Sequence, residues 1–155
     1  MISPSPTVPR PFSLQTVLDL MHNRTDKATQ HLARLIATER DAKTKLGMLQ
    51  QYRDEYAERF RQAAKNGLAQ PEWRNYQEFL NRLDEAIEQQ LQAVIVQETH
   101  TAAGQANWQQ QRTKLQAFDA LFERHRASEA RLALRQEQKA QDEYAARRKD
   151  DEQEY

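Results

Sequence analysis

The sequence predicts an all-α protein: two long helices in an antiparallel coiled-coil hairpin with an overhanging C-terminal helix. Three observations predict it. The composition is poor in core-forming residues, with 38% hydrophobic against a usual ~45–50% and 30% charged against ~25%. Only 3 of the 155 residues are glycine, and the many Gln, Glu, Arg, Ala and Leu residues favour helix. Apolar side chains also recur at alternating steps of three and four residues, as in a coiled-coil seam.

Proline, glycine and serine mark the expected ends of the helices. Four of the five prolines lie in the first twelve residues, which predicts a flexible tail there. Ser13 suits an N-cap, Gly67 suits the left-handed residue that ends a helix, and Pro71 suits the first turn of the next one. The expected segments are a Pro-rich tail over residues 1–12, a helix over 13–66, a turn over 67–70, a helix over 71–149 and an acidic tail over 150–155. One coiled-coil domain therefore spans residues 13–149.

Two apolar stripes give the register of the hairpin. The stripe of the first helix runs from Leu14 to Ala63, and twelve of its fifteen positions are apolar. The stripe of the second helix runs from Trp73 to Phe122. Paired in opposite directions, the stripes set small residues against large ones, which lets two helices interdigitate. Four predicted pairs are Ala28 with Trp108, Leu32 with Gly104, Thr25 with Gln111, and Glu39 with Gln97. The alternative is a longer bundle formed by self-association.

The same sequence argues against several classes of function. Without cysteine there is neither a disulfide scaffold nor a cysteine metal site. The longest apolar run, residues 93–96, is far too short to span a membrane, and we see no secretory signal. The 23 basic and 23 acidic residues balance, which removes the electrostatic footprint of a nucleic-acid binder. The four histidines lack metal-ligand spacing. We expect a cytoplasmic protein that is not an enzyme, without metal, cofactor or small-molecule substrate.

A flank of apolar residues beside the seam is the first candidate binding surface. Its residues come from both helices near the turn: Leu49, Tyr52, Tyr56, Phe79, Leu83 and Ala86. Contiguous exposed aromatic residues mark protein interfaces. The alternative is a wide apolar stripe whose rings merely cover the seam.

The C-terminal part of the second helix is the second candidate. The first helix begins near residue 13, so the second has no partner beyond about residue 123. Roughly 25 residues would then project as a single helix some 35–40 Å long. Residues 124–149 hold eight basic and four acidic side chains. The basic residues that we single out are Arg126, Arg131, Arg135 and Lys139. They are either a docking site for a partner or an ordinary solvated face.

Several segments between about residues 12 and 147 together have the pattern of a known family. They are Phe12-Ser13-Leu14-Gln15-Thr16-Val17-Leu18-Asp19-Leu20, Leu49-Gln50-Gln51-Tyr52-Arg53-Asp54-Glu55-Tyr56, Asn66-Gly67 followed by Trp73-Arg74-Asn75-Tyr76-Gln77-Glu78-Phe79, Leu83-Asp84-Glu85-Ala86-Ile87-Glu88-Gln89-Gln90, Trp108, Leu115-Gln116-Ala117-Phe118, and Gln138-Lys139-Ala140-Gln141-Asp142-Glu143-Tyr144. In these segments the chain resembles the flagellar FliJ protein family, small soluble components of the bacterial flagellar type III export apparatus.

The resemblance implies a protein shaped like the stalk of a rotary ATPase. It implies binding to the hexameric export ATPase and its regulator, coupling of that ATPase to the cytoplasmic domain of the export-gate membrane protein, and escort of export chaperones. Such a protein takes part in flagellum biogenesis and motility, as a monomer at the inner membrane export apparatus. The gate-binding residues would be the apolar flank named above. Lys45 and Gln90 depart from the best-known relatives, which have Gln and His there.

Two other functions fit the residues. One is a structural coiled coil that dimerises through its seam, and the other is the equivalent stalk protein of a virulence type III secretion system. For contact with the ATPase, the overhanging helix is the physical candidate because of its basic surplus.

Overall fold

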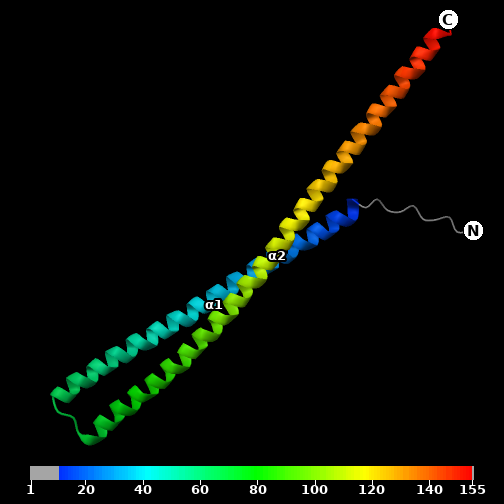
Figure 1. The fold of residues 1–155 in the computed structure, drawn as a ribbon. Coiled ribbons are helices and arrows are strands. Elements are labelled where there is room, and N and C mark those ends of the chain that lie inside the picture. Colours follow the sequence, from blue (N-terminus) through cyan, green and yellow to red (C-terminus); the bar gives the residue numbers. More distant parts are fainter. Residues whose placement is uncertain (1–10, 155) are drawn as a thin grey trace, which may run out of the picture. The chain divides into compact units, whose positions relative to one another are not determined.

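Two long helices make up nearly all of the computed structural model, which describes residues 11–154. Helix α1 runs from Pro11 to Lys65 and helix α2 from Gln70 to Gln153, 55 and 84 residues long. A short turn joins them, and no strand occurs between residues 11 and 154 (Figure 1). This confirms the predicted all-α fold of two packed helices. The expected Pro-rich tail lies outside the described residues up to residue 10.

The ends of the helices differ from the predicted ones by a few residues. Because α1 begins at Pro11, Ser13 lies inside its first turn and is not the N-cap. Proline is tolerated there since its missing N–H would have no partner within the helix. At the other end of the chain, the expected acidic tail is helical as far as Gln153. No proline or glycine follows Gly104, and the Glu, Gln, Arg and Ala residues of this segment propagate helix well.

The turn forms as its residues predict. Gly67 adopts a positive φ of 90°, a conformation that costs glycine little because it lacks a Cβ. The N–H of Gly67 donates to the carbonyl of Ala64 at 3.3 Å, which satisfies one of the last carbonyls of α1. At the start of α2, the N–H of Trp73 donates to the carbonyl of Ala69 at 3.1 Å. Pro71 lies between them in the first turn.

The chain divides into two compact units, and each contains parts of both helices. One unit is Asp26–Gln110, which includes the turn; the other combines the chain up to Thr25 with the chain from Gln111 onwards. In the unit Asp26–Gln110, α1 and α2 run antiparallel on either side of the turn (Figure 1).

The predicted stripes are the contact between the helices. The most buried residues, each less than a tenth exposed, are Leu18, Ala28, Leu83 and Val94, together with Gly104. All of them are stripe positions. Every position of the first stripe is buried or half-buried, and in the second stripe only Trp73, at 40%, is exposed. No described side chain is fully buried, because a layer of two helices leaves every residue close to water.

Contacts across the unit Asp26–Gln110 confirm the predicted register. Gly104 packs so closely that a Cβ added to it would overlap Cδ1 of Leu35 and stand 3.7 Å from Cδ1 of Leu32. Nearby, the indole N–H of Trp108 donates to the hydroxyl of Thr29 at 2.9 Å. The hydroxyl of Thr101 lies 3.4 Å from the carbonyl of Leu35. Small and polar residues therefore let the two backbones approach each other here.

The second unit keeps the same register. The hydroxyl of Thr25 lies 3.3 Å from the carbonyl of Gln111, the partner predicted for it, and 2.9 Å from that of Met21 in its own helix. One turn further, Nε2 of His22 is 3.8 Å from a carboxylate oxygen of Asp119.

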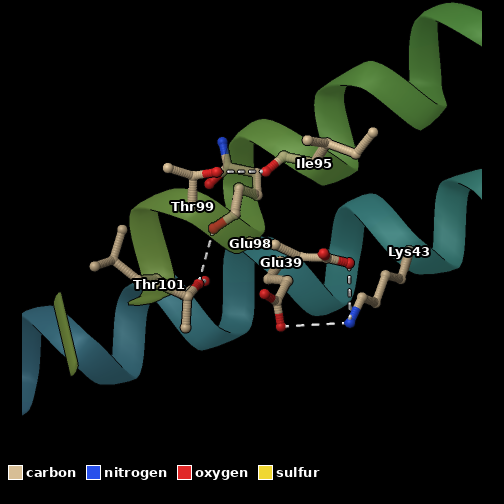
Figure 2. Close-up of polar contacts among 8 residues, drawn as sticks. Glu39, Lys43, Ile95, Glu98, Thr99 and Thr101 are labelled. Carbon is tan, nitrogen blue, oxygen red and sulfur yellow. Dashed lines mark hydrogen bonds and ion pairs between the residues drawn. The ribbon is translucent and has the colours of Figure 1, made fainter. Parts of the chain in front are cut away.

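The predicted polar layer of Glu39 and Gln97, both half-buried, has an ion pair beside it. A carboxylate oxygen of Glu39 lies 3.6 Å from Nζ of Lys43, and Nζ of Lys43 also lies 3.6 Å from a carboxylate oxygen of Glu98 of α2 (Figure 2). The carbonyl of Gln97 accepts a hydrogen bond from Thr101 at 3.0 Å. Lys43 thus links the helices from the edge of the seam, where its ammonium group stays in water.

Candidate protein-binding surfaces

An aromatic cluster lies beside the turn in the unit Asp26–Gln110. Tyr56 is its centre: its ring centroid is 4.4 Å from that of Phe79, 5.3 Å from that of Tyr76 and 6.5 Å from that of Tyr52. Tyr52 and Phe79 meet edge to face at 6.2 Å. These are distances at which aromatic pairs attract each other. The cluster therefore joins α1 to α2 through rings rather than through aliphatic side chains alone.

The cluster continues toward the turn through Phe60 and Trp73, which are positions of the two stripes that form the seam. Phe60 lies 5.3 Å from Tyr76 and 4.8 Å from Trp73, again centroid to centroid. Trp73 remains 40% exposed. The signal for this extension was present in the sequence, since the three rings occupy matching stripe positions near the turn.

The six residues of the predicted apolar flank are brought together but are not equally accessible. Tyr52 is 46% exposed, whereas Leu83 is only 8% exposed and belongs to the core. The other four, Leu49, Tyr56, Phe79 and Ala86, are half-buried. A partner on this surface would touch Tyr52 and the rims of its neighbours, while Leu83 would support them from below.

A shallow groove on the outer side of α1 extends this surface. It was not predicted. Its lining residues are Lys45, Met48, Leu49, Gln51, Tyr52 and Glu55. Met48 is 65% exposed, more than any other large hydrophobic residue of α1 with a described side chain. Spacing was the available signal: Lys45, Met48, Tyr52 and Glu55 follow each other at steps of three, four and three residues.

Two positions that depart from the resembling family have different surroundings. Lys45 is exposed and lines the groove. Gln90 is half-buried, and its side-chain amide donates to the carbonyl of Ala42 at 3.0 Å across the seam. Gln90 is therefore occupied in holding the two helices together.

One ion pair borders the aromatic cluster. Nε of Arg53 lies 2.6 Å from a carboxylate oxygen of Asp84. This hydrogen bond, together with the negative charge of Asp84, raises the pKa of Arg53 above its ordinary value. Both side chains are more than a third exposed, so the pair fixes geometry and contributes little to stability.

The side chains of the C-terminal part of α2 are exposed to solvent. Every described residue from Arg126 to Glu154 is exposed, including Leu132, Leu134 and Tyr144. The four predicted basic residues do not share one face. Arg131, Arg135 and Lys139 follow at four-residue steps and lie on one side of the helix, whereas Arg126, five residues before Arg131, points to another side.

Other kinds of site find no support in the described residues. Between residues 11 and 154, no group of three or more His, Cys, Asp or Glu side chains is arranged to hold a metal ion. Neither α1 nor α2 has a stretch long and apolar enough to cross a membrane, as far as the structure is described.

Comparison with known proteins gives a consistent result. The family model described as "Flagellar FliJ protein" matches residues 10–154. Among curated proteins, the chain is similar to the flagellar FliJ protein of Salmonella typhi, with 30% identity over 135 residues, which is 87% of this chain and 92% of the relative. It is also similar to the flagellar FliJ protein of Escherichia coli strain K12, with 28% identity over the same shares of both chains.

Proposed function

Because the chain belongs to the flagellar FliJ protein family and is a component of flagellar protein export, we propose that it is a stalk-like adaptor between the export ATPase and the export gate. It binds the hexameric ATPase and its regulator at one end and the cytoplasmic domain of the gate membrane protein on the apolar flank. This contact holds it at the inner membrane. It also escorts export chaperones. The flagellar names of both relatives favour this role over that of a virulence secretion stalk.

The main support for the proposed gate contact is the aromatic cluster, which is only partly covered by the rest of the protein. Tyr52 and Phe79 come from different helices, meet at 6.2 Å, and leave Tyr52 46% exposed. A ring left exposed on a soluble protein costs free energy that a partner can recover. Aromatic residues of this kind supply much of the binding energy at interfaces.

The gate contact is tested with the double variant Tyr52→Ala/Phe79→Ala. We expect its helical circular dichroism to stay near that of the unsubstituted chain, and its affinity for the gate's cytoplasmic domain to fall by about tenfold or more. Ile36→Ala is the matched control, since Ile36 is a 41% exposed apolar residue elsewhere on α1. If the double variant unfolds and no separate binding defect is measurable, the rings belong to the core alone.

The bare end of α2 supports the ATPase contact. Arg131, Arg135 and Lys139 share one face, are exposed, and make no ion pair with any described residue. Such a row of charges can steer association with an acidic surface. Removing the chain after Arg124 is expected to abolish binding to the ATPase and stimulation of its activity, while the hairpin keeps its melting temperature.

A charge-reversal series sharpens the same test. Arg131→Glu, Arg135→Glu and Lys139→Glu together should weaken ATPase binding, most strongly at low salt. Arg126→Glu, which changes the charge on another side of the helix, is the matched control and should have little effect. If the chain truncated after Arg124 binds the ATPase and stimulates its activity as well as the full chain does, the C-terminal part of α2 is not the ATPase contact.

Light scattering separates the adaptor from a structural coiled coil that dimerises. A concentration-independent mass near the 18.2 kDa of one chain is expected for the intramolecular hairpin. A mass of two chains at all concentrations would favour the dimer.

A further inference from the structure

The asparagines of the chain differ in their backbone surroundings, although all of them are exposed. They are Asn23, Asn66, Asn75, Asn81 and Asn107. Four of them lie inside α1 or α2, and a residue with a large side chain follows each of the four. Asn66 instead follows the last residue of α1, and Gly67 comes directly after it in the turn. Exposure therefore does not distinguish Asn66, but its backbone and its neighbour do.

The hydrogen bonds that hold the backbone of Asn66 and Gly67 are long. The N–H of Asn66 donates to the carbonyl of Gln62 and the N–H of Gly67 donates to the carbonyl of Ala64, both at 3.3 Å. Backbone hydrogen bonds usually measure about 2.7–3.2 Å. The end of a helix also opens at a much smaller cost in free energy than its interior does. The amide nitrogen of Gly67 is therefore released more readily than the amide that follows any of the other four asparagines.

The space around this part of the turn is open. A Cβ added to Gly67 would have no atom within 4 Å, its chain neighbours aside, and glycine has no side chain of its own to shield its nitrogen. The side-chain amide of Asn66 forms no hydrogen bond with any described residue. When the end of α1 opens, Cγ of Asn66 and the backbone nitrogen of Gly67 are thus free to meet.

From this arrangement we propose that Asn66 is a site of spontaneous deamidation. Hydroxide removes the proton from the amide nitrogen of Gly67, and this nitrogen forms a bond to Cγ of Asn66. The bond between Cγ and the side-chain nitrogen breaks, and that nitrogen takes up a proton from water and leaves as ammonia. Water then opens the cyclic succinimide. Opening at Cγ gives aspartate, whereas opening at the backbone carbonyl leaves the chain linked through Cγ, as isoaspartate.

The reaction changes both the charge and the backbone of the turn. A carboxylate replaces a neutral amide at the C-terminal end of α1, where the helix dipole disfavours negative charge. Glu72 lines the same groove as Asn66, so a second carboxylate is already there. Isoaspartate also adds a methylene group to the backbone, which displaces the N–H of Gly67 from its acceptor. We therefore expect the turn to loosen as the protein ages.

Peptide mapping of the full chain tests the site. The chain is kept at mildly alkaline pH, digested, and analysed by chromatography and mass spectrometry. The peptide that contains Asn66 should convert at least about tenfold faster than those that contain the other four asparagines, with isoaspartate in excess of aspartate. Conversion no faster than that of Asn75, an exposed asparagine of the same compact unit, overturns the proposal.

Two further outcomes of the mapping would also overturn it. If Asn66 converts in the chain unfolded by urea but not in the folded chain, the hydrogen bonds of the turn protect it. If aspartate forms without isoaspartate, the side-chain amide is hydrolysed directly and the nitrogen of Gly67 takes no part.

Variants at the same position separate the charge from the backbone change. Asn66→Gln should not convert, because its longer side chain places the amide carbon one bond further from the nitrogen of Gly67, and it should melt like the unsubstituted chain. If Asn66→Gln gains negative charge on ageing as fast as the unsubstituted chain, measured by ion exchange, another residue is the site. Asn66→Asp should melt a few degrees lower, and the aged chain lower still. Equal melting of the fresh and the aged chain overturns the proposed loosening of the turn.

Discussion

Alanine substitutions at the two glycines within the helices are predicted to change stability in opposite directions. Gly47 and Gly104 lie inside α1 and α2 and belong to the same compact unit. Replacing an interior helical glycine by alanine gains roughly 0.5–1 kcal/mol. Nothing lies within 4 Å of a Cβ added at Gly47. Gly47→Ala should therefore stabilise the unit by about that amount.

At Gly104 the same gain is offset by a steric cost. The added methyl group would overlap Cδ1 of Leu35, so the end of this leucine side chain must shift within the seam. Overpacking of this kind typically costs about 1–3 kcal/mol. Gly104→Ala should then destabilise the unit by about 1 kcal/mol, and the two alanine variants should differ by roughly 1–3 kcal/mol.

Urea denaturation followed by far-ultraviolet circular dichroism measures both changes, and the slope of the transition should stay the same in all variants. In the background Leu35→Ala the obstacle is gone, so Gly104→Ala should no longer be harmful; this coupling is read from a double-mutant cycle. Stabilisation by Gly104→Ala equal to that by Gly47→Ala would refute the close approach of the helices at Gly104.

Two further predictions concern the aromatic cluster and the charged link between the helices. Tyr56 contacts three other rings and is half-buried. Tyr56→Ala should therefore lower the free energy of unfolding by roughly 2 kcal/mol, whereas Tyr52→Ala, at a more exposed ring, should lower it by about 1 kcal/mol or less. Thermal melts of both variants measure the two losses, and equal losses would contradict this prediction. Lys43 bridges Glu39 and Glu98 with its side chain half in water, so Lys43→Ala should cost less than about 1 kcal/mol, and melts at high salt should show no difference from the unsubstituted chain.

The seam is well predicted because the three-four spacing of the apolar residues can be read directly from the sequence. Gly67 at a positive φ and the approach of Gly104 to Leu32 could both be inferred from spacing alone. The start of α1 could not, because proline breaks a helix in its interior but is accepted in its first turn. Ser13 therefore lies inside the helix.

The binding surfaces were harder to predict for a different reason. A heptad pattern tells which side of a helix meets its partner, but not how far each neighbouring side chain stands clear of it. The flank predicted from spacing includes Leu83, which is buried, and omits Met48, which is 65% exposed. Similarly, the positive charge alone groups Arg126 with Arg131, although five residues turn it to another side of the helix.

The absence of any fully buried side chain from the described residues bears on how such a protein can change its length in evolution. No central core has to be rebuilt, so stability accrues layer by layer. Seven residues could be deleted from one helix if seven were also deleted from the facing part of the other. A deletion confined to one helix would shift every layer between that point and the free ends, and would set large residues against large ones.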